Sequence, residues 1–263
     1  MNVTRFKAAV NRILVDNSPL PLLFLILTIL VNIAWTLFHG TIRANLTILG
    51  VITFAMMSLT HAALTRGGEY AYSVLLTTCI TSYIAEFVGV HFHSLFGRYD
   101  YTSHLGPMIF GIPVLIPFAW FMMMYPCLLV GQTISKNIFM SSAVTGALMM
   151  GWDLYLDPQM TRETYWFWQF VTDNINGIPI SNYVSWFVVS SVIAYQINKR
   201  TPTTPITTRD FAPFAMLMWV WLGSFLVNIV PFAPFLGQPG VAVSGFVGMG
   251  LVMVPVIMTM RQV

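Results

Sequence analysis

Charged residues are scarce in this chain. Asp and Glu together number 9 among 263 residues, and all charged residues make up 8% of the sequence, while hydrophobic residues make up 57%. Because a soluble domain carries roughly 25% charged residues, this composition excludes an ordinary soluble protein and indicates an integral membrane protein. The net charge of +3 comes from short basic runs at the ends of apolar segments, so nucleic acid is not expected as a partner.

Cysteine and the usual cofactor motifs are scarce or absent as well. The two cysteines, Cys79 and Cys127, fall inside apolar segments, so we expect core residues and no disulfide framework. The sequence has no G-x-G-x-x-G loop, no P-loop and no G-x-S-x-G nucleophile motif. Its histidines are too few for a multi-histidine di-iron site, and His91, His93 and His104 lack a recognisable zinc spacing. We therefore expect no metal and no cofactor.

Long apolar runs, by contrast, are abundant. A helix needs roughly 20 apolar residues to cross the hydrocarbon core. The sequence holds eight such runs, at about 20–39, 43–64, 70–92, 108–132, 138–156, 181–198, 211–233 and 240–260. The polar segment before the first run lacks a signal-peptide cleavage site, so we expect that run to be retained. We predict an all-α, polytopic transmembrane helix bundle in one domain, residues 1–263, with about eight spans or alternatively seven.

Lys and Arg are unevenly distributed between the two sides of an eight-span bundle. One side receives nine of the twelve: Arg5, Lys7, Arg12, Arg66, Lys136, Lys199, Arg200, Arg209 and Arg261. The other side receives Arg43, Arg98 and Arg162. The positive-inside rule then predicts a multi-pass protein of the cell membrane with both termini in the cytoplasm. The same topology brings three polar segments together at the non-cytoplasmic face: Glu86 to Tyr101, Trp152 to Gln169 and Gly177 to Trp186.

Two of the few acids, Asp153 and Asp157, lie at the end of a long apolar run. Their i, i+4 spacing puts them on one helix face. Because Asp157 precedes Pro158, it could simply be solvated at a helix exit. Alternatively, a carboxyl group in an apolar, aromatic-lined site can hold a proton at neutral pH and act as a general acid. Paired carboxylates also bind Mg²⁺, but that usually needs further oxygen ligands.

Glu86 is the third unusual acid, alone within an apolar run. It could be structural, paired with Arg98 or with a buried tyrosine. Ionisable residues inside the membrane are rare and usually functional, so we favour a role in the site.

The nearby loop segments are rich in aromatic and turn-forming residues. Phe96 to Tyr101 reads as a turn that enters an extended stretch, with Tyr99 and Tyr101 as interface anchors or site residues. Gly177 to Pro179 reads as a turn into the next helix. Asn182 could cap that helix or donate a hydrogen bond in the site. Trp166 to Trp168 is more typical of packing than of a cofactor site.

Taken together, the motifs resemble one family. They are Glu86 with Gly89, Phe96-Gly97-x-Tyr99-x-Tyr101, Pro113 and Pro117 with Trp120, Trp152-Asp153-x-x-x-Asp157-Pro158-Gln159-Met160, Trp166-x-Trp168, and Gly177-x-Pro179-x-x-Asn182-Tyr183-x-x-Trp186. This set resembles the membrane-embedded carotenoid 1,2-hydratases, the family of γ-carotene 1′-hydratase and bisanhydrobacterioruberin hydratase. The Trp-Asp-x-x-x-Asp-Pro element is its most specific part.

The resemblance implies a cofactor-independent hydro-lyase that adds water to the C1–C2 double bond of an acyclic (ψ) carotenoid end. An acid protonates C2, a tertiary carbocation forms at C1, and water captures it to give a tertiary alcohol. We expect Asp153 to be the acid, and Asp157 or Glu86 to be its proton partner or the base for water. The expected substrate-binding residues are Tyr99, Tyr101, Trp152, Asn182, Tyr183 and Trp186. The expected partners are the carotenoid, water and membrane lipid.

Two other interpretations remain at this stage. The first is another membrane prenyl-chain enzyme, either a carotenoid cyclase or a prenyltransferase. A prenyltransferase would need two Asp-rich Mg²⁺ motifs, and the sequence holds one pair. The second is a non-enzymatic lipid or pigment carrier, for which matching Gly/Pro breaks in two halves would be expected.

Overall fold

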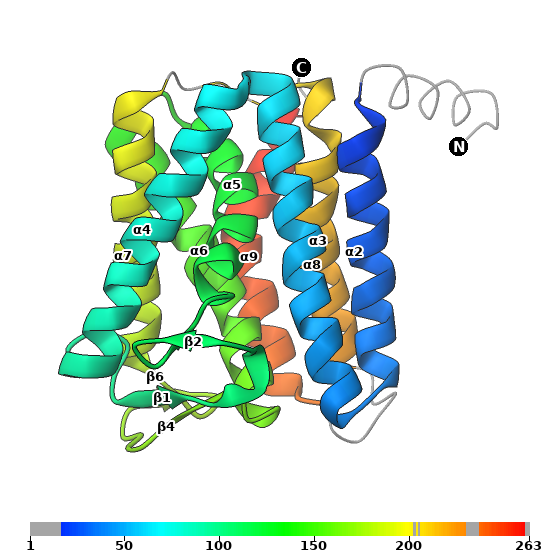
Figure 1. Cartoon of the computed structure of the whole chain (residues 1–263). Helices are drawn as coiled ribbons and strands as arrows, with labels where there is room; N and C mark the ends of the chain where they lie inside the picture. The colour runs from blue at the N-terminus through cyan, green and yellow to red at the C-terminus, as the bar shows by residue number, and fades with distance from the viewer. Residues whose placement is uncertain (1–16, 202–203, 205, 230–236, 261–263) are drawn as a thin grey trace.

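Eight α-helices make up most of the part of the chain that the computed structural model describes, which is residues 17–201, 204, 206–229 and 237–260. They are α2 (Pro19–Leu37), α3 (Gly40–Arg66), α4 (Gly68–Phe92), α5 (Ile116–Ile134), α6 (Ile138–Arg162), α7 (Ile180–Arg200), α8 (Phe211–Ile229) and α9 (Pro239–Met260). Consecutive helices run in opposite directions, so α2 begins and α9 ends at the same end of the bundle (Figure 1). The predicted all-α polytopic bundle is confirmed.

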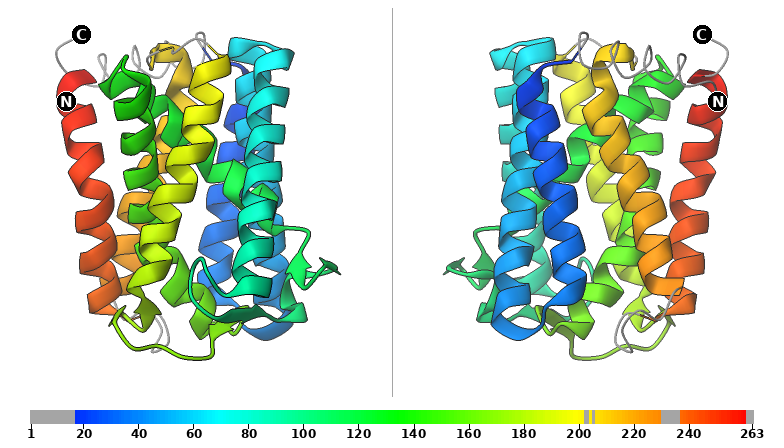
Figure 2. Two further views of the ribbon diagram at one scale, coloured as in Figure 1. Left: turned by 90° about the vertical axis from the view of Figure 1, so that its left-hand side faces the viewer. Right: turned by 90° about the vertical axis from the view of Figure 1, so that its right-hand side faces the viewer.

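Six of these helices, α2, α3, α4, α5, α8 and α9, are long and apolar enough to cross a membrane on their own composition. Helices α6 and α7 are more polar, but they have 25 and 21 residues. At a rise of 1.5 Å per residue they extend over about 37 and 32 Å, which matches a hydrocarbon core of about 30 Å. Both run the length of the bundle in each view (Figure 2). Several of their polar side chains are buried against other helices, among them Ser141, Thr145, Asp153, Ser190 and Asn198.

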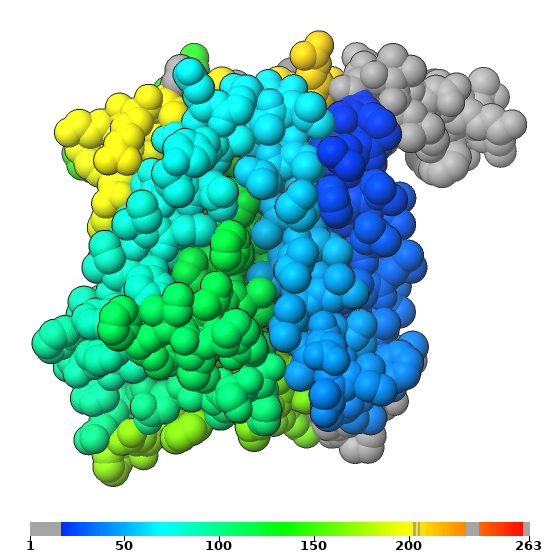
Figure 3. Space-filling model, in the orientation of Figure 1, coloured from blue at the N-terminus to red at the C-terminus, as the bar shows by residue number. Residues whose placement is uncertain are grey.

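Helix α5 forms the centre of the bundle. Every residue from Trp120 to Val130 is buried, and α3 and α4 largely cover the helix in the space-filling view (Figure 3). Small residues allow the helices around it to approach closely. A Cβ atom at Gly151 of α6 would lie 2.8 Å from the backbone nitrogen of Met249 on α9. Glycine at such crossings is typical of helix packing in membranes, where small residues let backbones meet.

Two predicted helix boundaries were wrong. The apolar run 108–132 is not helical throughout, because it begins with an antiparallel hairpin of β2 (Met108–Ile109) and β3 (Ile112–Pro113), and α5 starts only at Ile116. Hydropathy does not distinguish such a hairpin from a helix, but Phe110 and Gly111 both adopt positive φ, as in a tight hairpin turn. The run 138–156 extends further than predicted, to Arg162.

The two ends of the bundle differ in character. The strand end carries β1 (Tyr99–Tyr101), β4 (Trp166–Trp168), β5 (Asn174–Ile175), β6 (Ile178–Pro179) and the hairpin β2–β3 (Figure 1). The basic end carries Arg66, Lys136, Lys199, Arg200 and Arg209, as the distribution of charge predicted. Four basic residues assigned to the same end, Arg5, Lys7, Arg12 and Arg261, lie outside the described residues.

Candidate active site

The three polar segments predicted to converge do meet at the strand end. Strand β1, after α4, pairs antiparallel with β4, after α6, so that Tyr99 lies opposite Trp168 and Tyr101 opposite Trp166. The turn into β1 uses positive φ at Phe96 and Gly97. The third segment, at the start of α7, hydrogen-bonds to α6 through Asn182.

Glu86 is buried in α4 and accepts three hydrogen bonds. Its Oε2 accepts from the hydroxyls of Tyr99 (2.5 Å) and Tyr101 (2.8 Å), and its Oε1 accepts from Nε1 of Trp120 at 3.0 Å. An ionised carboxylate can only accept hydrogen bonds, so three donors suit that form. Of the two structural partners considered, the tyrosine pairing is present, whereas Arg98 lies over the ring of Phe170.

A glycine makes this arrangement possible. A Cβ atom at Gly89, one helical turn after Glu86, would lie 2.9 Å from the Tyr99 hydroxyl and 2.9 Å from the Phe96 ring. Any larger residue would push Tyr99 away from the carboxylate. The Glu86–Gly89 pair in the sequence thus reflects close packing of β1 against α4.

The other two acids of the site, Asp153 and Asp157, form a pair of carboxyl groups on α6. The side-chain amide of Asn182 donates to Oδ2 of Asp153 (2.8 Å) and also to Oδ2 of Asp157. Nε1 of Trp166 donates to Oδ1 of Asp157 at 3.1 Å. The single Asn182 amide thus bridges the two buried carboxyl groups, and Oδ1 of Asp153 has no hydrogen-bond partner among the described residues. Two ionised carboxylates held side by side in an apolar interior would repel each other, so a single proton on the pair favours this arrangement.

The structure overturns the simpler interpretations of two of these residues. Asp157 is not solvated at a helix exit, because Pro158 lies inside α6 and the Asp157 side chain is only 2% exposed. Asn182 does not cap α7, because Pro179 occupies the N-cap position. Both side chains belong to the carboxyl cluster.

A cavity of about 450 Å³ lies against these groups. Of the predicted site residues, it is lined by Glu86, Tyr99, Tyr101, Trp152, Asp157, Asn182 and Trp186. Its aromatic wall is ordered: the rings of Trp120 and Trp186 stack with centroids 3.9 Å apart, and Trp152 meets Trp186 edge-on at 5.8 Å. From the carboxyl groups the cavity extends across the bundle to α2, α3 and α8.

Two predicted site residues do not line the cavity. Asp153 is fully buried behind Asp157 and Asn182. Tyr183 faces away and packs with Leu154 and Ile178.

Sequence reasoning also missed residues that do line the cavity. Trp120 donates to Glu86, and Trp166 donates to Asp157. Trp166 and Trp168 are two residues apart on β4 and both line the cavity. This period-two spacing could have indicated that they share one face of the strand. The lining residues of α2 and α8 carry no motif.

The cavity holds acids without a matching cation. Its described lining contains no Lys, Arg or His. Burial, and after it the charge of Glu86, raise the pKa of Tyr99 and of Tyr101 well above the usual tyrosine range. Both tyrosines therefore stay protonated and remain hydrogen-bond donors to Glu86. Within the described residues, no group of three His, Cys, Asp or Glu side chains is placed to hold a metal ion.

Comparison with known proteins identifies the family. Residues 43–258 match the family model described as carotenoid biosynthesis protein. The chain belongs to this family. Glu86, Asp153 and Asp157 lie within the matched region, whereas α2 precedes it.

One curated relative is similar as well. It is bisanhydrobacterioruberin hydratase of Haloarcula japonica, which is 28% identical over 172 residues, or 60% of this chain and 58% of the relative. The match thus spans less than two thirds of that protein. No solved structure matches the chain.

Proposed function

We propose that this protein hydrates the C1–C2 double bond at the acyclic end of a carotenoid. The family assignment and the hydratase relative support carotenoid chemistry. The observation that carries the reaction type is the cavity itself: Asp157, which has a second buried aspartate beside it, and Glu86, which accepts three hydrogen bonds, border one aromatic space. Addition of water to an unactivated alkene needs an acid, a site that tolerates a carbocation, and a base.

Asp157 is the acid in this proposal. Sequence reasoning favoured Asp153, but Asp157 borders the cavity and Asp153 does not. Asp153 acts through Asp157 as a positioning residue, because the same Asn182 amide holds both carboxyl groups and one proton between them relieves their repulsion. The proton moves from Asp157 to C2 of the substrate, and the π electrons of the C1–C2 bond form the new C–H bond.

The aromatic wall stabilises the tertiary cation left at C1. Trp120, Trp152 and Trp186 line the cavity, and an aromatic ring face turned towards a cation stabilises it by about 0.5–2 kcal/mol. Because the described lining contains no Lys, Arg or His, no positive side chain of that lining repels the carbocation.

Glu86 is the base for water. Its three donors favour the ionised form, and Tyr99 and Tyr101 aim the carboxylate at the cavity. Water attacks C1 through its oxygen, and Glu86 takes the released proton, which yields a tertiary alcohol. The proton returns from Glu86 to the aspartate pair through water in the shared cavity, so the net change is the addition of one water.

The basic end supports a membrane orientation. By the positive-inside rule we expect the end with Arg66, Lys136, Lys199, Arg200 and Arg209 to face the cytoplasm, and the acids would then lie near the opposite interface of the cell membrane. Carotenoid, lipid and water all meet at that depth.

The test uses a host that accumulates lycopene, with pigments extracted and analysed by mass spectrometry. The wild-type chain should convert lycopene to products heavier by one water per hydrated end. Asp157→Asn and Glu86→Gln should each reduce this product by about 10²–10⁴-fold, the range for loss of a general acid or base. Asp153→Asn should reduce it less. Asp100→Asn, an acid of the strand end outside the cavity, is the matched control and should change nothing.

Other outcomes identify other functions. A product of unchanged mass but altered absorption would indicate a cyclase, and a product with an added prenyl unit would indicate a prenyltransferase. Unchanged pigment with carotenoid bound to the purified protein would indicate a carrier. If Asp157→Asn still hydrates lycopene, the acid is assigned wrongly.

A further inference from the structure

The cavity has a second end, remote from the acids. It continues between α2 and α8, where its walls include Asn32, Gly223 and Ser224. Along α8 the lining runs from Met216 to Val227, which is about 16 Å at 1.5 Å per residue. The space therefore reaches from the strand end towards the middle of the membrane.

Among the described residues that line the cavity, two are exposed on the outer surface. They are Ile33 on α2, 43% exposed, and Leu226 on α8, 55% exposed. One lies on each side of the same seam, and α2 and α8 are neighbours in the side view (Figure 2). Both residues are apolar and belong to helices apolar enough to span a membrane. The place where the cavity lining reaches the outer surface, between Ile33 and Leu226, thus faces lipid.

The volume of the cavity limits how much of the substrate it can hold. A cavity of about 450 Å³ is of the order of pockets for drug-sized ligands. That volume accommodates the reacting end of a carotenoid but not its whole length, so the rest of the polyene must leave the protein. The seam between α2 and α8 connects the acids with the hydrocarbon core, in which the polyene dissolves.

We infer that the seam between α2 and α8 is a lateral portal, through which the end of the carotenoid slides from the bilayer to Asp157 and Glu86. The remaining polyene lies between the two helices and continues into lipid during the reaction. This inference rests on the proposed function for the identity of its ligand. Helix α2, which forms one wall of the portal, lies before the region matched by the family model.

Gly223 is the residue best placed to block the portal. A Cβ atom there would meet only the Trp219 ring, at 3.6 Å, so alanine fits. Gly223→Trp should fill the seam and lower hydration of lycopene in vesicles by about ten- to hundredfold, because the indole leaves the substrate too little room to enter. Leu222→Trp is the matched control, because Leu222 is exposed on the same helix and does not line the cavity.

A labelling experiment measures access without catalysis. Ser224→Cys is made in a Cys79→Ala, Asp157→Asn background, in which the fully buried Cys127 is the remaining native thiol. The protein is reconstituted into phosphatidylcholine vesicles with or without lycopene and treated with N-phenylmaleimide. Lycopene should slow labelling of Ser224→Cys several-fold and leave a Leu222→Cys control unchanged.

The results separate the two proposals. Equal labelling with and without lycopene, or full activity of Gly223→Trp, would overturn the portal. Protection by lycopene in a protein whose wild-type form makes no hydrated product would support the portal and overturn hydration. Equal loss of activity in Gly223→Trp and Leu222→Trp would show a general packing defect and also overturn the portal.

Discussion

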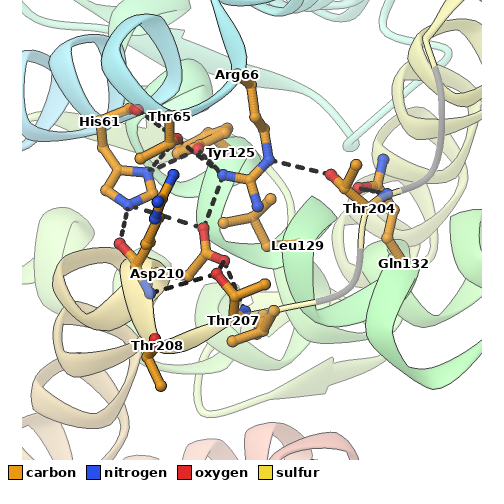
Figure 4. Close-up of polar contacts among 12 residues, drawn as sticks. His61, Thr65, Arg66, Tyr125, Leu129, Gln132, Thr204, Thr207, Thr208 and Asp210 are labelled. Atoms are coloured by element: carbon orange, nitrogen blue, oxygen red, sulfur yellow. Dashed lines mark hydrogen bonds and ion pairs between the residues drawn. The ribbon is translucent and has the colours of Figure 1, made fainter. Parts of the chain in front are cut away.

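Two buried polar clusters, one at each end of the bundle, differ in how their charge is balanced. At the basic end, the Arg66 cluster (His61, Arg66, Tyr125 and Asp210) joins α3, α5 and the turn before α8 (Figure 4). Nη1 of Arg66 lies 2.7 Å from Oδ1 of Asp210, and His61 Nδ1 lies 2.8 Å from the Tyr125 hydroxyl. At the strand end, Glu86 and Asp157 accept hydrogen bonds from neutral donors, and no Lys, Arg or His is among the described residues that line their cavity.

The difference shows what makes a buried acid functional. In the Arg66 cluster the other oxygen of Asp210 accepts from the backbone nitrogen and hydroxyl of Thr207, so the carboxylate is fully engaged. None of the cluster lines the cavity. Asp157 and Glu86, by contrast, border empty space that a ligand can fill. A paired acid holds helices together, and an acid with neutral partners beside a cavity can exchange a proton.

The largest effect is expected from Asp157→Asn, which should abolish hydration without loss of stability. The amide is nearly the same size as the acid, and it removes a buried ionisable group that has no cation. We expect activity to fall by about 10²–10⁴-fold, measured on pigment extracts. The thermal unfolding temperature of the protein purified in detergent should match or exceed that of the wild type. A clear fall in that temperature would show that the pair is structural.

The opposite result is expected from Arg66→Met at the basic end. Asp210 would remain buried without its cation, which typically costs about 3–5 kcal/mol of unfolding free energy. The unfolding temperature should drop, while hydration per folded molecule stays unchanged. Lys199→Met, an exposed residue of the same end, is the control and should have little effect. Loss of specific activity at unchanged stability would contradict the view that the Arg66 cluster stabilises the fold while the cavity acids carry out the reaction.

A smaller effect is expected when one donor to Glu86 is removed. Tyr101→Phe deletes a 2.8 Å hydrogen bond to the carboxylate, and hydrogen bonds to charged groups are worth about 1.5–3 kcal/mol. Turnover should fall by about 10–100-fold in steady-state assays with lycopene vesicles. Tyr72→Phe, at a well-exposed tyrosine, is the control.

The same donors predict the response to alkaline pH. The raised pKa values of Tyr99 and Tyr101 keep both hydroxyls protonated as pH rises to the ordinary tyrosine value of about 10. Activity should therefore show no loss attributable to tyrosine between pH 8 and about 10. A loss in that range that disappears in Tyr101→Phe would contradict the assignment.

Sequence alone predicts the helices and the acids, for different reasons. Apolar runs show where helices cross the membrane, because the hydrocarbon core requires apolar side chains over about 20 residues. The hairpin before α5 escaped prediction because Met108 to Pro113 is as apolar as a helix. Asp153, Asp157 and Glu86 were found because charge is rare in such a chain.

The sequence could not show which side chains face the cavity. The i, i+4 spacing puts Asp153 and Asp157 on one face, but the choice between them depends on α7 and on the wall built by α2 and α8. Those walls are made of ordinary apolar residues with no distinguishing pattern. Only the packed bundle shows that Asp157 borders the cavity.

The smallest effect is expected from Tyr183→Phe, a residue predicted from sequence to bind substrate. Its hydroxyl donates to the carbonyl oxygen of Ile175 at 3.3 Å, outside the cavity. Loss of this bond should cost no more than about 1 kcal/mol of unfolding free energy and leave hydration within about twofold of the wild type. Asn182, one residue earlier on α7, faces the aspartates, and Asn182→Ala should lower activity in the same assay. Equal effects of the two changes would show that the start of α7 acts as a packing unit, and that proximity to the acids does not decide function there.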